Sequence, residues 1–383
     1  MHQIYELLEQ KKETMYGYLK EIVEKESHSY DKESLDMLAN WIAATFEELT
    51  GGKAEIISND QYGNHVRGEF GEGDGQILIL AHFDTVWPKG TLEKIPFQMT
   101  DGIARGPGVF DMKGGLIQGL FALHALQDLG QTLDKKVVLF FDSDEEIGNP
   151  SSKELIEKEA SKSDVVFVLE PGMSKLGCLK TSRKGVGIFT IEVTGVPSHA
   201  GIDPEAGKSA IEELAHQTLY LHSLTDLELG TTLNVGKITA GTASNVVAEK
   251  AYAEVDLRVK TKEEYERVLP LILNLQPKIE GVKVEVTGGI NRWPLERTEQ
   301  VAEMFEKAKQ IAESSLGFEL TEMETGGGSD GNLTAPFAPT LDGLGAVGDG
   351  AHANHEYLVL DKMTERSALL ALLLLEYGRD KEE

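Results

Sequence analysis

Residues 137–148 have the sequence Val-Val-Leu-Phe-Phe-Asp-Ser-Asp-Glu-Glu-Ile-Gly. Its five consecutive apolar residues are typical of a strand that is buried on both faces, as in a parallel sheet covered by helices. Two similar apolar runs lie at 77–80 and 165–169, and helical patterns at 116–129 and 152–160 separate the three runs. This alternation predicts βαβ units, and hence an α/β fold whose central sheet is mostly parallel and covered by helices.

Helical patterns also occupy both ends of the sequence. Residues 1–25 carry apolar side chains at helical spacing and predict one amphipathic surface helix. A second helix is predicted at 32–50, with Gly51-Gly52 as its end, and a last one at 362–377.

A different pattern begins after Lys184. Residues 187–195 alternate between apolar and polar side chains, as a half-exposed strand does. The predicted elements that follow are a helix, two strands, a helix and a strand, at 204–221, 232–238, 247–259, 262–275 and 282–287. The order β-α-β-β-α-β predicts a ferredoxin-like domain at 184–290, inserted into a domain formed by 1–183 and 291–383.

Composition excludes several classes of partner. Asp and Glu outnumber Lys and Arg by 64 to 37 among 383 residues, which gives a formal net charge of −27. An acidic chain suits neither the phosphate backbone of nucleic acids nor an anionic membrane surface. The sequence also has no apolar run near the roughly 20 residues of a membrane helix and no signal-peptide pattern, so we expect a cytoplasmic protein.

Residues with metal-binding or acid–base chemistry follow the apolar runs. His82 and Asp84 end the first run two residues apart, so both point to one face, where the acid can hold one imidazole nitrogen while the other binds a metal. Glu170 ends the third run, before Pro171. Ligands gather at the carboxyl ends of parallel strands. Each residue alone also fits an ordinary structural role, such as an ion pair at a strand end.

Acids in two loops extend this set. Asp111 lies in the glycine-rich stretch 106–115, where its two oxygens suit a bridge between two cations, although a helix N-cap would suit the same sequence. Asp144, Glu145 and Glu146 repel one another unless a cation neutralises them, and a solvated acidic loop is the alternative. Adjacent glutamates can also divide two tasks, metal binding and general-base catalysis.

A late histidine completes the candidate ligands. His352 and His355 both lie in the stretch Gly-Ala-His-Ala-Asn-His-Glu-Tyr at 350–357, and spacing alone does not choose between them. Because Cys178 is the only cysteine, thiolate zinc sites are excluded and any metal is held by His, Asp and Glu. Such ligands suit Zn²⁺, or Mn²⁺ and Co²⁺ as substitutes.

Six motifs, in order along nearly the whole chain, resemble those of the dinuclear-zinc metallopeptidases and aminoacylases, the family that includes glutamate carboxypeptidases of the carboxypeptidase G type. The motifs are His82-Phe83-Asp84-Thr85-Val86, Gly106 to Gly115, Asp144-Glu145-Glu146-Ile147-Gly148, Glu170-Pro171, Pro197-Ser198-His199-Ala200-Gly201 and Gly326-Gly327-Gly328-Ser329-Asp330.

The resemblance implies a role for each matching residue. It implies two Zn²⁺ per chain, with Asp111 as the bridge, Glu145 as the general base and Asp84 as the residue that orients a histidine ligand. The remaining implied metal ligands are His82, Glu146, Glu170 and His355, with His352 either a bystander or a residue that supports a ligand from behind.

The resemblance also assigns residues of the inserted domain and its surroundings. It implies that His199 reaches the active site of a partner subunit and stabilises the oxyanion, so that the enzyme is a homodimer formed through a lid domain. An exposed sheet edge, which a ferredoxin-like domain has, is a template for such pairing. Residues implied to contact substrate are Asn245, Arg258, Arg292, Gly328 and Ser329, although the sequence around Arg292 departs from the family pattern.

The expected reaction is the metal-dependent hydrolysis of an amide in a small peptide or N-acyl amino acid. We expect a carboxypeptidase that releases a C-terminal amino acid such as glutamate. An aminoacylase, a deacylase or a dipeptidase is the alternative, because these enzymes share the same ligands. A more remote alternative is a binding protein that keeps the metal pocket but catalyses no reaction. Glu145 argues against this alternative, because such a protein needs no general base beside Glu146.

Overall fold

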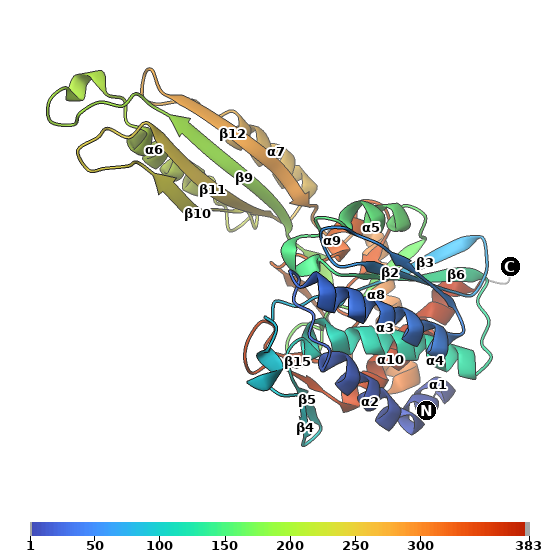
Figure 1. Ribbon diagram of the computed structural model, residues 1–383. Coiled ribbons are helices and arrows are strands. Elements are labelled where there is room, and N and C mark those ends of the chain that lie inside the picture. Colours follow the sequence, from blue (N-terminus) through green and yellow to red (C-terminus); the bar gives the residue numbers. More distant parts are fainter. Residues whose placement is uncertain (1, 380–383) are drawn as a thin grey trace. The chain divides into compact units, whose positions relative to one another are not determined.

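The computed structural model describes residues 2–379, which form two compact units (Figure 1). Unit 1 comprises Met1–Thr181, Arg297–Glu324 and Ser329–Glu383, and unit 2 comprises Ser182–Glu296 and Thr325–Gly328. The predicted insert, 184–290, lies inside unit 2. The short segment Thr325–Gly328, which the sequence did not single out as part of the insert, belongs to unit 2 as well.

Unit 1 is built on a six-stranded sheet of order β1-β2-β6-β3-β7-β14. Strands β3 (Gly75–His82), β6 (Lys135–Asp142), β7 (Val165–Val168) and β14 (Thr340–Leu341) are parallel neighbours, whereas β1 (Lys53–Ile57) and β2 (His65–Phe70) pair antiparallel at one side. The three predicted apolar runs are therefore the centre of the sheet, and the predicted α/β fold with a mostly parallel sheet is confirmed.

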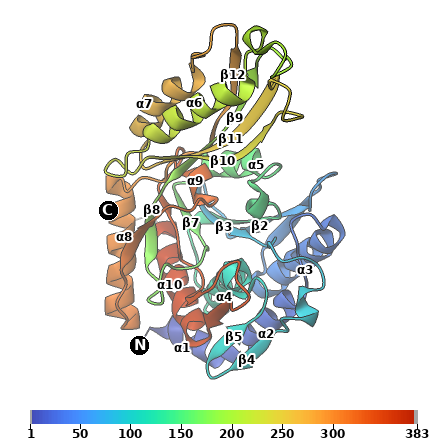
Figure 2. The ribbon, with the colours of Figure 1, turned by 90° about the vertical axis from the view of Figure 1, so that its left-hand side faces the viewer.

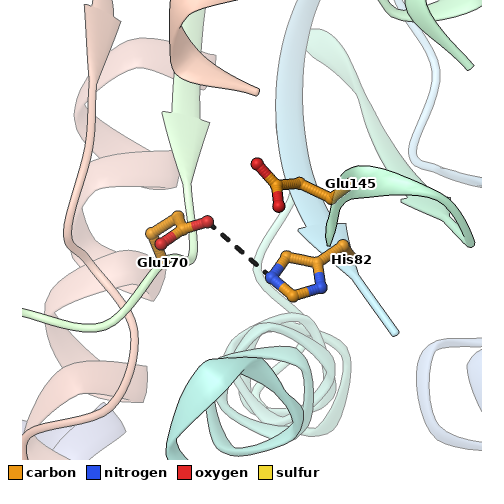
Figure 3. A group of neighbouring side chains, drawn as sticks. All are labelled: His82, Glu145 and Glu170. Carbon is orange, nitrogen blue, oxygen red and sulfur yellow. Dashed lines mark ion pairs between the residues drawn. The ribbon is translucent and has the colours of Figure 1, made fainter. Parts of the chain in front are cut away.

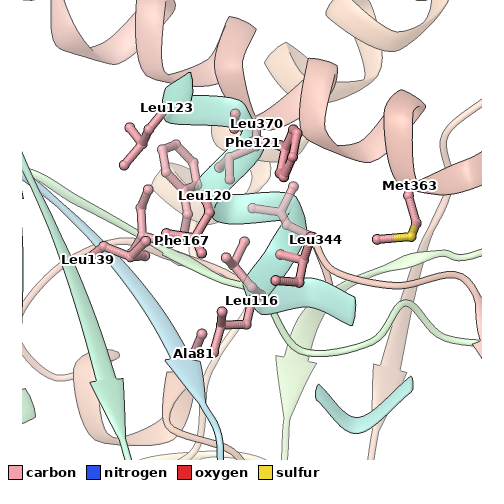
Figure 4. Close-up of a cluster of buried hydrophobic side chains, with 14 of the residues drawn as sticks. Ala81, Leu116, Leu120, Phe121, Leu123, Leu139, Phe167, Leu344, Met363 and Leu370 are labelled. Carbon is pink, nitrogen blue, oxygen red and sulfur yellow. The ribbon is translucent and has the colours of Figure 1, made fainter. Parts of the chain in front are cut away.

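Helices cover both faces of this sheet (Figure 2). One face packs against α3 (Lys32–Thr50), α4 (Gly114–Asp128) and α10 (Asp361–Gly378), and the other against α5 (Lys153–Ala160) and α9 (Gly331–Thr334). Alternate residues of β3 show the division, because Ile79 belongs to the first core and Leu80 to the second. Figure 4 shows the first core, in which Leu116 and Leu120 of α4 pack beside Leu139 and Phe167 of the sheet.

The remaining elements of unit 1 frame this core. They are α1 (Gln3–Gln10), α2 (Lys12–Val23) and α8 (Glu299–Ile311), together with a four-stranded sheet of β4 (Gln98–Thr100), β5 (Ile103–Arg105), β15 (Gly348–Asp349) and β16 (Tyr357–Val359). Strands β8 (Leu179–Arg183) and β13 (Glu322–Thr325) contain residues at which the chain passes from one unit to the other. None of the helices in residues 2–379 combines the length and the apolar character needed to cross a membrane.

Unit 2 has the predicted ferredoxin-like order. It runs β9 (Gly185–Thr194), α6 (Ala210–Ser223), β10 (Thr232–Ala240), β11 (Lys250–Val259), α7 (Lys262–Leu273) and β12 (Lys283–Arg292). The strands form an antiparallel sheet of order β10-β11-β9-β12, with both helices on one face (Figure 1). Strand β10 is therefore an edge strand.

Two predicted helices differ from the structure. The single helix expected at 1–25 is broken at Lys11, where φ −99° and ψ 5° end α1 before α2 begins. Its apolar residues are buried in the core of unit 1, as expected for an amphipathic helix. The helix expected from Pro204 begins at Ala210, because Gly207 is extended and Ser209 caps the helix by accepting a hydrogen bond from the Glu212 N–H.

Candidate active site

The carboxyl ends of β3, β6 and β7 bring three predicted residues together. Figure 3 shows His82, Glu145 and Glu170 pointing toward one another. His82 Nε2 lies 3.7 Å from a Glu170 carboxylate oxygen, and one donor atom of each of the three residues lies within 4.8 Å of the others. His82 and Glu170 are buried. The order of strands in the sheet thus brings together His82 and Glu170, which are 88 positions apart in the sequence.

Asp111 lies in the turn Val109–Lys113, before α4. Its Oδ1 is 3.3 Å from His82 Nε2, and its Oδ2 is 3.3 Å from His352 Nε2. One carboxylate therefore offers each of its oxygens to a different histidine, which is the arrangement of a ligand that bridges two ions.

The structure distinguishes between the two late histidines. His352 Nε2 lies 3.1 Å from Glu146 Oε1 as well as close to Asp111, whereas His355 is exposed and its ring lies beside Gly350. Since the imidazole that reaches the carboxylates is that of His352, the predicted assignment to His355 does not fit this geometry. The loop turns at His352, which has a left-handed φ of 62°.

Asp84 fixes the orientation of this site. His82 Nδ1 lies 3.0 Å from the Asp84 backbone oxygen and 3.4 Å from its Oδ1, so this nitrogen carries the proton and Nε2 is left as the ligand atom. The Asp84 carboxylate also accepts hydrogen bonds from the backbone N–H groups of Glu145 and Glu146, each at 3.2 Å, and from Ser29 Oγ at 2.7 Å. One buried acid therefore positions residues from two strand ends.

Burial and neighbouring charges shift the pKa values of three site residues, Asp111, Glu146 and His352. Burial, together with the nearby Asp111 carboxylate, raises the pKa of Glu146 to about 8, although His352 opposes this shift. Hydrogen bonds to Asp111 and Glu146 raise the pKa of His352 to about 10. Burial would raise the pKa of Asp111, but hydrogen bonds from His352 and His82 hold it well below its usual range. Clustered acids of this kind need positive charge.

The donor set fits a pair of divalent ions. One half offers His82, Asp111 and Glu170, and the other offers His352, Asp111 and Glu146, so each half has one nitrogen and carboxylate oxygens. Such mixed sets suit Zn²⁺. Glu145 is not needed to fill either set, which leaves its carboxylate for acid–base work.

Two further residues support these ligands and were missed from the sequence. Lys180 of β8 places Nζ 3.6 Å from Glu170 Oε2, so the second oxygen of that carboxylate faces a buried ammonium group. Asp144, expected as part of a repelling cluster, is buried and accepts hydrogen bonds from the Ser151 N–H and the Ser152 hydroxyl. It therefore anchors the turn that carries Glu145 and Glu146. The contacts in the structure identify these roles, because the sequence does not show which residues will be partners.

Unit 2 brings His199 and Asn245 together. The Asn245 carbonyl accepts a hydrogen bond from the Ala200 N–H at 3.0 Å, and His199 pairs with Val246. The exposed His199 ring accepts hydrogen bonds at Nδ1 from the Gly201 and Ile202 N–H groups, each at 3.2 Å. Since backbone N–H groups only donate, the imidazole is the tautomer with its proton on Nε2, which can therefore act as a donor.

The other predicted substrate residues have defined surroundings. Arg258 forms a two-pronged ion pair with Asp256 of its own strand, with N–O distances of 2.9 Å. Arg292 is buried at the end of β12, where a Cβ on Gly328 would lie 3.2 Å from its Cδ. Ser329 belongs to unit 1, is fully buried, and donates its hydroxyl to Asp342 at 2.7 Å. The structure therefore gives the Ser329 side chain a local structural bond rather than an open pocket face.

Comparison with known proteins agrees with this geometry. The family model described as Peptidase family M20/M25/M40 matches residues 78–376. Carboxypeptidase G2 of Pseudomonas sp. (strain RS-16) is 28% identical over 372 residues, 95% of this chain and 89% of that protein. Acetylornithine deacetylase of Klebsiella pneumoniae (strain 342) is 27% identical over 369 residues, 87% of this chain and 89% of that protein.

A solved structure shares the fold. The YXEP protein of Bacillus subtilis, described as a dinuclear metal binding peptidase from the M20 family, superposes with a TM-score of 0.69 at 18% identity, over 96% of this chain and 99% of that one. The family match confirms the expected resemblance and the expectation of a metal-dependent enzyme that hydrolyses amide bonds. The family model covers most of the chain, including the carboxyl ends of β3, β6 and β7, and the chain belongs to Peptidase family M20/M25/M40.

Proposed function

We propose that this protein is a carboxypeptidase that hydrolyses the amide bond before a C-terminal amino acid, with Glu145 as general base and two divalent ions, Zn²⁺ by preference, in the site. The observation that carries the proposal is the placement of Asp111, whose two oxygens each face a different histidine. The proposed ligands are His82, Asp111, Glu146, Glu170 and His352.

The residues of the chain divide the reaction between them. The ions, when bound, supply Lewis-acid activation of water and of the scissile carbonyl. Glu145 takes the proton of the attacking water and later delivers it to the leaving nitrogen. Asp84 holds His82 and the Glu145 backbone in place, as its hydrogen bonds indicate. His199, with its outward Nε2 proton, is the proposed donor to the oxyanion.

A single substitution tests the role of Glu145. Glu145→Gln should lower kcat by about 10²–10⁴-fold, the usual contribution of a general base, while metal content stays unchanged. Glu146→Gln is the matched control on the neighbouring residue, and it should lose metal as well as activity because it removes a ligand. Retention of more than about 10% of kcat by Glu145→Gln would refute the assignment.

A substrate with a C-terminal acidic residue such as glutamate is the proposed class. The relative that matches over 95% of the chain is named as a carboxypeptidase, and Arg292 and Arg258 are cations in unit 2 that suit a substrate carboxylate. The Arg258 fork is held by Asp256, so a carboxylate bound there would have to displace that acid.

Deacylation of an N-acyl amino acid is the second candidate function, because the acetylornithine deacetylase also matches over most of the chain. A panel of paired substrates decides between the two. Each pair carries the same N-acyl group on glutamate and on ornithine, and a second series replaces the acyl group by an amino acid. Carboxypeptidase action predicts the highest kcat/KM on peptidyl or acyl glutamate, whereas preference for the acetylated basic amino acid would favour the deacylase.

We also propose that the enzyme is a homodimer formed through unit 2. Strand β10 is an edge, and Ile238 on it is 52% exposed. On α6, which packs beside β10, Ile211 and Leu219 are 48% and 72% exposed and lie eight residues apart, on one face of the helix. An open strand edge beside exposed apolar side chains suits two-fold pairing with a second copy.

A further inference from the structure

Glu356 is a buried acid four residues after His352. Each of its carboxylate oxygens accepts two hydrogen bonds. Oε1 accepts from the backbone N–H groups of Phe110 and Asp111, at 2.9 and 3.0 Å, and Oε2 accepts from the Gly108 N–H and the Trp87 indole, both at 2.9 Å. A carboxylate has about four acceptor positions, so this one is fully used.

Three of the four donors belong to the turn that carries Asp111. These backbone N–H groups lie just before α4, where the backbone leaves the helical conformation: φ and ψ are −115° and 98° at Asp111, and −128° and 35° at Met112. The Glu356 carboxylate accepts the hydrogen bonds of these N–H groups and so holds this irregular backbone in a single geometry.

The same residue constrains the second half of the site. Glu356 precedes β16 (Tyr357–Val359), and the loop before it carries His352. Because Glu356 is tied to the Asp111 turn, the His352 loop and that turn are joined beside the place where Asp111 Oδ2 faces His352 Nε2.

We propose that Glu356 is a positioning residue that sets the distance between the bridging carboxylate and the late histidine, and that it thereby determines how tightly the site holds its second metal ion. This inference rests on the proposed dinuclear function. The hydrogen bonds of Glu356 run to backbone N–H groups and to the Trp87 indole, so it acts on the ligands through the backbone. Outer-shell partners of this kind are typically worth about 10–100-fold in metal affinity.

The test is Glu356→Gln in the full chain. A glutamine keeps the size of the side chain, but its amide nitrogen faces two N–H donors whichever way the group turns. Metal-free protein is titrated with Zn²⁺, and separately with Co²⁺, whose visible absorption reports ligand geometry. We expect the second ion to bind about 10–100-fold more weakly and the Co²⁺ spectrum of that site to change, with KM unaltered and kcat restored by excess metal.

Glu213 provides the matched control. It is also buried and accepts hydrogen bonds from two backbone N–H groups, those of Lys278 and Ile279, but it lies in unit 2. Glu213→Gln should lower the thermal midpoint and leave both metal affinities and the Co²⁺ spectrum unchanged. A loss of metal binding equal to that of Glu356→Gln would overturn the inference.

Three further results bear on the proposed role of Glu356. If Glu356→Gln does not fold, Glu356→Asp and Trp87→Phe take its place, since each weakens only part of the bonding. Both should reduce affinity for the second ion by about 10-fold, the lower end of the outer-shell range. Wild-type affinity and spectrum in a folded Glu356 variant would overturn the inference alone. A wild-type protein that binds no divalent ion would instead overturn the proposed function, and this inference with it.

Discussion

At the scale of single residues, His352 and His355 show what the sequence leaves open. Both lie in one short loop and both are exposed, yet only His352 has Nε2 within 3.3 Å of two site carboxylates. The ligand types at the strand ends could be predicted because polar residues after buried strands need partners. The choice within the loop could not, since it depends on a left-handed turn at His352 and on the bonds of Glu356.

The two histidines give a direct prediction. Loss of a residue that supports a ligand typically weakens metal binding by about 10–100-fold. His352→Ala removes a ligand itself, so it should weaken binding of the second ion by more than this, and activity should fall as well. His355→Ala should keep both the metal and most of the activity. Metal titration and kcat/KM of the two purified variants check this, and the reverse pattern would return the ligand role to His355.

At the scale of elements, long periodic or continuous apolar segments were predicted well. The strand runs around 77–80, 137–141 and 165–169 match β3, β6 and β7, and the insert has the expected order of elements. Strands β4, β5, β15 and β16 were not predicted, because segments of two or three residues show no period. The break at Lys11 was missed because apolar spacing continues across it and neither Gly nor Pro marks it in the sequence.

The start of α4 supplies a prediction at this scale. A Cβ on Gly115 would lie 2.1 Å from the backbone oxygen of Leu169, the residue before Glu170. Gly115→Ala should therefore lower the free energy of unfolding by about 1–3 kcal/mol, the usual cost of overpacking, and should weaken metal binding by displacing Glu170.

Gly17 is the control for this substitution. It lies in α2 with nothing within 4 Å of an added Cβ. Gly17→Ala should stabilise the protein by up to about 1 kcal/mol through helix propensity alone. Chemical unfolding of both variants measures the difference, and a neutral Gly115→Ala would show that the helix start is not closely packed on the strand end.

At the scale of the whole molecule, the assembly is open to a test by mixing inactive variants. His199→Ala should lower kcat by about 10²–10³-fold without loss of metal, as expected for an oxyanion donor. If His199 acts in the site of the partner subunit, a mixed dimer of Glu145→Gln and His199→Ala has one intact site, and activity returns after subunit exchange.

The expected recovery is up to half of the wild-type activity per mixed dimer. Each variant mixed with itself is the control for exchange alone. If no activity returns after verified exchange, His199 acts in the site of its own subunit or takes no part in the reaction. If the protein sediments as a monomer at working concentration, the proposed homodimer is wrong.

The proposed bridge at Asp111 requires two metal ions in one site. The number of bound ions can be measured by elemental analysis of protein purified without chelators, followed by Zn²⁺ titration of the metal-free form. We expect close to two ions per wild-type chain and at most one tightly bound ion in His82→Ala or His352→Ala. Asp111→Ala should bind both ions weakly, since that carboxylate faces both histidines. A fully active wild-type protein with at most one tightly bound ion would contradict the proposed bridge.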